Sequence, residues 1–247
     1  MTDHIKITEH DGILEICFAR PEKKNALTNA MYAAASAALE AAQTNDAIRV
    51  VLFTAEGAAF TAGNDLAEFA AVASGASSES KARLLIAALA RAAKPIVAAV
   101  PGLAVGVGTT MLLHCDLVYV ADTAKLTTPF INLGLVPEAG SSVLMPARIG
   151  HLRAFAMFAL GESVSGTEAV TLGLANKAVP ADRVREEALA AARILASKPA
   201  GSVITTKRLM RGLPELLAKM DEEGAAFQER LTSDDARQAF AAFLGRK

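Results

Sequence analysis

The chain has 247 residues, of which 52% are hydrophobic, and its formal net charge at pH 7 is −1. A chain of this length buries roughly 70–75% of its unfolded surface, so it needs neither disulfides nor a metal ion to fold. The near-zero charge, without a basic stripe, argues against nucleic acid and anionic membrane as partners. We therefore expect one large α/β domain, or such a domain with a helical appendage.

Cysteine and histidine are sparse and follow no ligand pattern. Cys17 and Cys115 lie in separate apolar runs, which predicts buried free thiols in a reducing compartment. The four histidines lack metal-ligand spacing, so no metal site is expected. No apolar run approaches the ~18 residues that span a bilayer, and no leader or peroxisomal address is recognised. The sequence therefore predicts a cytoplasmic protein without membrane contact.

The first part of the chain begins with strand signals. Alternation over residues 4–8 and the run Ile13–Phe18 predict a β-hairpin. A polar loop ending at Thr28, a helix-capping residue, precedes apolar residues at helical spacing. Val50–Thr54 is a continuous apolar strand, of the kind that is covered on both faces of a sheet. The segment GAAFTAGNDL, residues 57–66, is expected to end this strand as a loop.

The alternation of helix and strand continues along the middle of the chain. Ser77–Ala93 is predicted to be helical and Ile96–Val100 to be a strand. A glycine-rich turn over residues 102–108 then runs into the apolar segment Thr109–Leu113, and Leu117–Val120 is strand-like. Strands that alternate with helices in this way predict an α/β layer fold.

The last part of the chain reads as helical. Ser165 and Glu168 have the spacing of a capping box, which marks a helix start. Three more helices are predicted, over residues 201–211, 215–230 and 234–244. We therefore divide the chain into an α/β part, residues 1–180, and a helical region, residues 181–247. The apolar stripes of these helices fit packing on another subunit as well as packing back on the α/β part.

Three segments carry candidate chemistry, although each alone also fits an ordinary turn. Small residues within the segment 60–66 let a ligand approach the backbone, where Ala62 offers its N–H. Gly102–Gly108 opens a helix, whose first N–H groups are free to bind a negative oxygen. This segment lacks the third glycine of a dinucleotide fingerprint, so no nicotinamide or flavin site is expected. Glu138 is a lone carboxylate in an apolar, small-residue segment, where it can carry a proton.

In combination the segments resemble a known family. FTAGNDL, KPIVAAVPGLAVGVG, HCDLVYVADTAKLTTP and LGLVPEAGSSVLMPARIG make the chain similar to the enoyl-CoA hydratase/isomerase (crotonase) superfamily over nearly its whole length. The resemblance implies a crotonase-like (ClpP/crotonase) spiral of ββα turns with a C-terminal helical trimerisation region. It also implies a homotrimer or a dimer of trimers. The implied substrate is an acyl-CoA thioester, with coenzyme A as part of the substrate and no separate cofactor.

The resemblance also implies roles for individual residues. The backbone N–H groups of Ala62 and Val107 would form an oxyanion hole for the thioester oxygen. Family members that hydrate carry two glutamates at positions that match Thr110 and Phe130, where this chain has no carboxylate. Glu138 stands where peroxisomal-type Δ3,Δ2-enoyl-CoA isomerases place their only acid/base. The implied reaction moves the double bond of a 3-enoyl-CoA to the 2-trans position through a dienolate, in fatty acid degradation.

Substrate contacts are expected along the same segments. They are assigned to Lys24, Ala26, Ala62, Gly63, Asn64, Asp65, Leu66, Thr110, Phe130, Leu135 and Pro137. Phe130 and Leu135 are expected to form an apolar wall that raises the pKa of Glu138 by desolvation, whereas Asp65 is expected to cap a helix. Two alternatives stay open: an enoyl-CoA hydratase or another thioester-enolate enzyme of the family, and a non-catalytic acyl-CoA-binding module.

Overall fold

The computed structural model describes residues 2–73 and 80–244. The chain begins with the antiparallel hairpin of β1 (Ile5–His10) and β2 (Ile13–Phe18), as predicted. The hairpin joins a larger sheet because β2 pairs in parallel with β3 (Val50–Ala55). β3 is buried along nearly its whole length, as expected of a strand covered on both faces.

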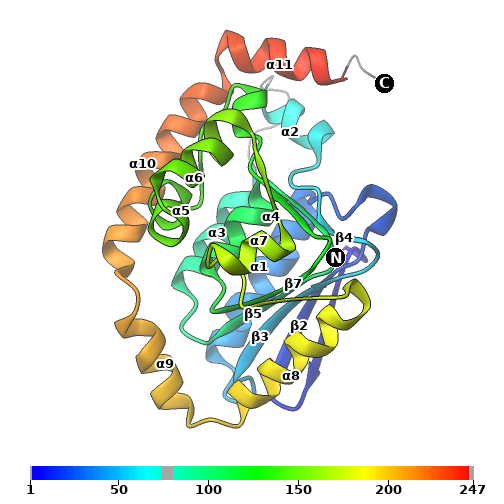
Figure 1. Cartoon of the computed structure of the whole chain (residues 1–247), viewed down its shortest axis with the longest axis vertical. Helices are drawn as coiled ribbons and strands as arrows, with labels where there is room; N and C mark the ends of the chain where they lie inside the picture. The colour runs from blue at the N-terminus through cyan, green and yellow to red at the C-terminus, as the bar shows by residue number, and fades with distance from the viewer. Residues whose placement is uncertain (1, 74–79, 245–247) are drawn as a thin grey trace.

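Two sheets are built from strands that alternate along the chain (Figure 1). The larger sheet has the order β1-β2-β3-β5-β7-β10 and the smaller one the order β4-β6-β8-β9. The remaining strands are β4 (Ala59–Thr61), β5 (Ile96–Val100), β6 (Leu103–Val105), β7 (Leu117–Ala121), β8 (Lys125–Thr127), β9 (Ser163–Ser165) and β10 (Lys177–Val179). Each of the successive pairs β3–β4, β5–β6 and β7–β8 gives its first strand to the larger sheet and its second to the smaller one. This arrangement confirms the predicted α/β fold and its ββ spiral.

The prediction that residues 57–66 form a loop is wrong. The segment contains β4, which pairs with β6, and it ends on the first residue of α2 (Leu66–Ala73). β4 has three residues, too few for an alternating pattern to be recognised in the sequence. Its central residue, Phe60, is fully buried, and its ring centroid lies 5.3 Å from that of Phe18.

Two helices of the α/β part begin where capping residues predict them. Thr28 caps α1 (Asn29–Thr44) by accepting the N–H of Met31, and Ser165 forms the predicted capping box with Glu168. The other helices of this part are α3 (Ala82–Arg91), α4 (Val107–Thr110), α5 (Ser141–Ile149), α6 (His151–Phe155) and α7 (Gly166–Thr171). Short turns of other helix types are η1 (Pro21–Lys23), η2 (Met111–His114), η3 (Phe130–Leu133), η4 (Ala156–Leu160) and η5 (Ala181–Arg183). The first residues of the predicted helix Ser77–Ala93 lie outside the described residues.

The four C-terminal helices pack in different ways. α8 (Val184–Ala196) lies on the larger sheet, against β3, β5 and β7, although it belongs to the region 181–247. α9 (Ala200–Leu209), α10 (Leu213–Leu231) and α11 (Asp234–Leu244) run along one side and over one end of the molecule (Figure 1). α10 contacts α3, and α11 contacts η3, so these two helices pack back on the α/β part.

Within residues 2–73 and 80–244, no helix combines the length and the apolar character that crossing a bilayer requires. In the same part of the chain no cluster of three or more His, Cys, Asp or Glu side chains is placed to hold a metal ion.

Two glycines let the chain segments of the spiral approach each other closely. A Cβ on Gly63, whose φ is +84°, would lie 2.8 Å from the carbonyl oxygen of Val105. A Cβ on Gly108 would lie 2.4 Å from the Thr61 side chain. These two contacts hold the loop after β4 against the turn between β6 and α4, and only glycine permits them.

We predict that Gly63→Ala lowers the free energy of unfolding by about 2–4 kcal/mol. The expected loss combines left-handed strain with overpacking against backbone, which cannot move aside cheaply. The control is Gly201→Ala in α9, where an added Cβ meets open space and should leave stability unchanged or raise it by up to about 1 kcal/mol. Urea unfolding followed by circular dichroism measures both. Equal stability of the two variants would contradict the close approach.

Candidate active site

A cavity of about 700 Å³ opens between α3 and α10. Three segments that are far apart in the sequence reach it: Asn64 from the loop after β4, Val107 from α4, and Glu138 from the turn before α5. Its apolar wall includes Phe69, Leu84, Ile86, Leu217, Met220 and Phe227. The glycine contacts at positions 63 and 108 therefore lie directly behind the part of the wall formed by Asn64 and Val107.

The backbone N–H of Ala62 does not face this cavity, which corrects the sequence-based assignment. It donates to the carbonyl oxygen of Lys24 at 2.9 Å. The loop at Leu27 pairs with Asn64 as a parallel bridge, in which Leu27 donates to Gly63 and receives the N–H of Asp65. Neighbouring N–H groups of an extended segment point in opposite directions, so the N–H of Asn64 points away from this bridge.

Two backbone N–H groups at the cavity are left without an acceptor. Among the residues that the structure describes, neither Asn64 N–H nor Val107 N–H donates to any group. Val107 is the first residue of α4, and an N–H at this position has no partner within its helix. Val107 therefore brings a free N–H to the cavity, and the second such N–H is that of Asn64 rather than Ala62. Their role as an oxyanion hole stays a prediction.

The side chain of Asn64 is held by a residue that sequence reasoning missed. The hydroxyl of Tyr32 donates to Asn64 Oδ1 at 2.6 Å, and Tyr32 itself is fully buried in α1. Burial holds the pKa of Tyr32 well above its ordinary value, with the charges of Glu138 and Glu68 adding to the effect. Tyr32 therefore keeps its proton and stays a donor. Only its apolar helical neighbours marked this position in the sequence.

Glu138 is a partly buried carboxylate that titrates near neutrality. Burial raises its pKa from 4.5 to about 7, and the negative charge of Glu223 acts in the same direction. The hydroxyl of Thr110 donates to Glu138 Oε1 at 2.5 Å and acts in the opposite direction by stabilising the ionised form. A carboxyl group with such a pKa can both accept and donate a proton near pH 7.

The apolar surroundings of Glu138 differ from the prediction. Phe130 and Leu135 are buried in a cluster with Phe240 of α11 and do not line the cavity. The ring of Phe130 stacks on Phe158, with centroids 6.4 Å apart. Residues of α2, α3 and α10 form the wall instead, because these helices pack across the cavity. Thr110 is fully buried and contacts Glu138 through its hydroxyl. Pro137, which precedes Glu138 in the chain, is partly buried.

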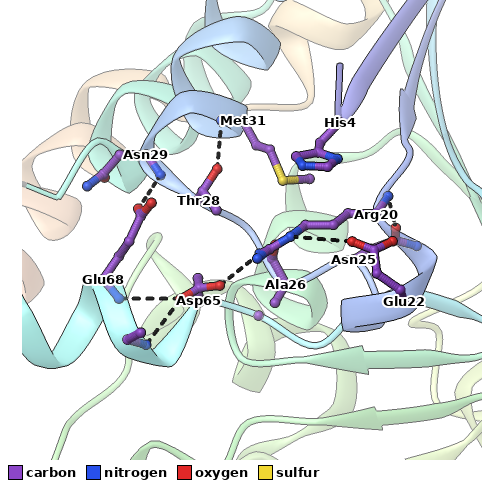
Figure 2. Close-up of polar contacts among 12 residues, drawn as sticks. His4, Arg20, Glu22, Asn25, Ala26, Thr28, Asn29, Met31, Asp65 and Glu68 are labelled. Atoms are coloured by element: carbon purple, nitrogen blue, oxygen red, sulfur yellow. Dashed lines mark hydrogen bonds and ion pairs between the residues drawn. The ribbon is translucent and has the colours of Figure 1, made fainter. Parts of the chain in front are cut away.

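Two further predicted residues lie close to Arg20: Ala26 in the loop before α1, and Asp65 directly before α2 (Figure 2). Asp65 accepts the N–H groups of Ala67 and Glu68, which confirms the predicted helix cap, and it pairs with Arg20 at 2.7 Å. The Ala26 N–H donates to Lys23, and the Ala26 carbonyl accepts from Arg20, so its backbone is engaged within the loop.

Lys24 and Leu66 are the last two of the predicted contacts. The side chain of Lys24 is exposed, and Leu66 opens α2 as a partly buried residue against the cluster of Phe130 and Phe240. Neither residue lines the cavity. A contact between Lys24 and the part of a ligand that extends outside the cavity stays a prediction.

The arrangement as a whole can bind an oxygen and move a proton. Two free N–H groups suit an oxygen that gains negative charge, because fixed dipoles stabilise it without reorganising. Among the described residues, the other carboxylate that lines the cavity is Asp221, whose side chain is 80% exposed and pairs with Arg83. On the described wall, Glu138 is therefore the one carboxylate that is at least partly buried.

Comparison with known proteins gives consistent results. The sequence profile described as enoyl-CoA hydratase/isomerase matches residues 8–247. The chain is 33% identical to enoyl-CoA delta isomerase 2 of Rattus norvegicus over 250 residues, 98% of this chain and 64% of the rat protein. It is 31% identical to 2,3-dehydroadipyl-CoA hydratase of Escherichia coli K12, over 98% of this chain and 95% of that one. The chain thus spans less than two thirds of the rat relative's length.

A solved structure with the same fold is that of an enoyl-CoA hydratase/isomerase from Pseudoalteromonas atlantica T6c. The two chains superpose with a TM-score of 0.93 at 38% sequence identity, over 99% of this chain and 98% of the other. Because the superposition covers nearly the whole of both chains, the two proteins share the fold described above.

We predict that Glu138→Gln stabilises the fold at high pH. The folded pKa of Glu138, about 7, exceeds the ordinary 4.5, so the folded state holds the proton longer and the free energy of unfolding falls as pH rises between these values. Glutamine stays neutral and escapes this loss. Urea unfolding should show a gain of about 3 kcal/mol above about pH 8 and little difference near pH 4.

The control for this measurement is Glu9→Gln, the same chemical change at an exposed position of β1. The stability of Glu138→Gln relative to the original chain should therefore change with pH. A difference that is the same at pH 4 and pH 8 would contradict a raised pKa of Glu138.

Proposed function

Because the chain belongs to the enoyl-CoA hydratase/isomerase family and has the crotonase fold, we propose that it is a Δ3,Δ2-enoyl-CoA isomerase. Its substrate would be an acyl-CoA thioester whose double bond moves from the 3 to the 2-trans position. Coenzyme A is then part of the substrate, and no further cofactor takes part in the chemistry. Fatty acid degradation in the cytoplasm is the setting we propose for this activity.

The observation that carries the proposal is that the described cavity wall has a single carboxylate that is not largely exposed, Glu138. A 1,3-shift of a proton needs one group that removes it and returns it, and Glu138 titrates near neutral pH. Hydration by the two-glutamate route needs a second carboxyl group. Thr110 and Phe130 occupy the two positions where hydratases of the family carry theirs, and neither side chain exchanges a proton near pH 7.

In the proposed reaction Glu138 removes a proton from C2 of the 3-enoyl thioester. The electron pair of the broken C–H bond moves into a dienolate, and the thioester oxygen takes the negative charge. The N–H groups of Asn64 and Val107 donate to that oxygen. Glu138 then returns its proton to C4, which restores a neutral, conjugated thioester. A positioned base of this kind contributes about 10²–10⁴-fold, and each oxyanion donor about 3–4 kcal/mol.

The apolar wall supports the same assignment. Phe69, Met220 and Phe227 line the cavity beside Glu138 and offer an acyl chain an apolar surface. A substrate that fills this space excludes water from the dienolate, which disfavours hydration. The relatives include one named as an isomerase and one named as a hydratase, so the reaction itself has to be measured.

We predict that the protein converts 3-enoyl-CoA to the conjugated 2-enoyl-CoA, measured as a gain of ultraviolet absorbance. With 2-enoyl-CoA supplied alone, the absorbance should persist. Glu138→Gln should lower kcat by about 10²–10⁴-fold because the proton carrier is lost, while calorimetry should show that acyl-CoA binding remains. The exposed Glu9→Gln serves as the matched control.

Two outcomes would overturn the proposal. Loss of absorbance from 2-enoyl-CoA would identify a hydratase or a related enzyme. Binding of acyl-CoA without turnover of either substrate, in the original chain and in Glu138→Gln alike, would identify a non-catalytic binding module.

We also propose that the chain assembles as a homotrimer or a dimer of trimers. Large apolar side chains are exposed at the end of α9, where Leu209 is 77% and Met210 81% exposed, and on α6, where Leu152 is 84% exposed. Large apolar side chains that are this exposed favour burial against a second copy.

The expected consequence is that Met210→Glu, combined with Leu209→Glu, yields a smaller species than the original chain. A buried charge in an apolar contact is costly, so association should weaken. Light scattering after gel filtration measures the mass. The control is Ile7→Glu on β1, which is 47% exposed and far along the chain from α9. A monomeric original chain would refute the assembly.

A further inference from the structure

We propose that Glu223 is a positioning residue for the reaction: from α10 it fixes the turn that carries Glu138, so the helix that walls the cavity also holds the acid/base in place. This inference rests on the proposed function, because it assumes that Glu138 is the proton carrier. Glu223 carried no signal in the sequence, where it reads as one more polar residue of a C-terminal helix.

The first observation is the pair of hydrogen bonds that Glu223 accepts. The N–H of Gly140 donates to Glu223 Oε2 at 2.5 Å, and the N–H of Ser142 donates to Oε1 at 2.8 Å. Both N–H groups belong to the start of α5, where a helix leaves its N–H groups without internal partners. Gly140 has no side chain with which to cap them. Glu223, which is 6% exposed, therefore caps α5 from another helix.

The second observation is the backbone conformation of the turn. Ala139 has φ +63° and Gly140 has φ +70°, so two consecutive residues are left-handed. For alanine this conformation costs roughly 1–2 kcal/mol and persists only where the surroundings hold it. The carbonyl oxygen of Ala139 accepts from His114 Nε2 at 2.8 Å, and Glu223 holds the next N–H groups. The turn is thus fixed from both sides directly after Glu138.

The third observation is the contact of α10 with this turn. A Cβ on Gly140 would lie 2.5 Å from Leu216 and 3.3 Å from Met220, so the helix packs directly on the glycine. Met220 and Phe227 of the same helix line the cavity. Displacement of α10 would therefore open the cavity and release the Glu138 turn together.

The charge of Glu223 gives the contact an electrostatic consequence. Its negative charge adds to burial in raising the pKa of Glu138 to about 7. Two other titratable groups lie near Glu138 and its turn: Tyr32 of α1 and His114 of η2. The other charged groups that line the described cavity are Lys81, Arg83, Arg91 and Asp221. Burial lowers the pKa of His114 to about 4, so this histidine is neutral in the pH range of the reaction.

The test compares three variants in the isomerase assay across pH. Glu223→Gln removes the charge and one of the two acceptors. Glu223→Asp keeps the charge but shortens the side chain, which moves the acceptors. Glu222→Gln is the matched control on the neighbouring exposed position of α10. The acidic limb of kcat/KM reports the ionisation of Glu138 in the free enzyme, because the base acts only when it is ionised.

We expect Glu223→Gln to move the midpoint of this limb to lower pH by about half a unit or more, since a neighbouring negative charge is lost. Its plateau kcat should fall by about tenfold to 10²-fold, as expected for a base displaced by up to about 1 Å. Glu223→Asp should lose kcat to a similar extent while it keeps the midpoint. A pH profile of Glu223→Gln that coincides with that of Glu222→Gln would overturn the inference.

A failure of this inference can be distinguished from a failure of the proposed function. If Glu138→Gln retains full turnover, the proposed function is wrong whatever Glu223 does. If Glu138→Gln is inactive but Glu223→Gln behaves like the original chain, only the role of Glu223 is wrong. Carbon-13 NMR of the glutamate carboxyl groups tests the inference without turnover. The signal that is missing from the spectrum of Glu138→Gln identifies the carboxyl group of Glu138. In Glu223→Gln this signal should titrate at lower pH than in the original chain, and an unchanged titration refutes the inference.

Discussion

The close approach of two backbone segments is the constraint on which the site depends. Gly63 lies against Val105, and Gly108 lies against Thr61, at distances that exclude any side chain. These contacts place the loop after β4 beside the start of α4, so that two N–H groups that find no acceptor among the described residues reach one cavity. Each segment alone would be an ordinary strand end. The spiral, in which successive ββ units stack, makes them a pair.

The site is maintained at the expense of stability. A carboxyl group with a pKa near 7 is penalised in its ionised form, and Ala139 is held in a conformation that alanine rarely adopts. Both features lie in the same turn, between Thr110 on one side and Glu223 on the other. The surrounding α/β core, with its fully buried strands, supplies the stability that tolerates them. Strain and desolvation concentrated at a cavity are the expected signature of a functional site.

Local patterns predicted what depends on local sequence. Buried strands, capped helices, the Val107 turn and the isolated Glu138 were all recognisable in the chain. The cavity-facing N–H was wrongly assigned to Ala62 because the direction of an N–H depends on the segment that pairs with its strand. Here that segment is the loop at Leu27. The prediction placed Phe130 and Leu135 on the cavity wall, whereas α11 buries them and α3 and α10 form the wall. Tyr32 and Glu223 were missed because tertiary docking alone brings them to the site.

In the proposed isomerisation, the contact of Thr110 with Glu138 explains why a single carboxylate suffices at this place. A glutamate at position 110 would add a second negative charge beside Glu138, and the two groups would share protons. The hydroxyl instead donates to Glu138 and stabilises its ionised form, so desolvation and hydrogen bonding balance near neutral pH. A base poised in this way removes a proton readily and still returns it. The proposed isomerisation then needs no second acid, and in this proposal the neighbouring space is left to apolar side chains rather than to an activated water molecule.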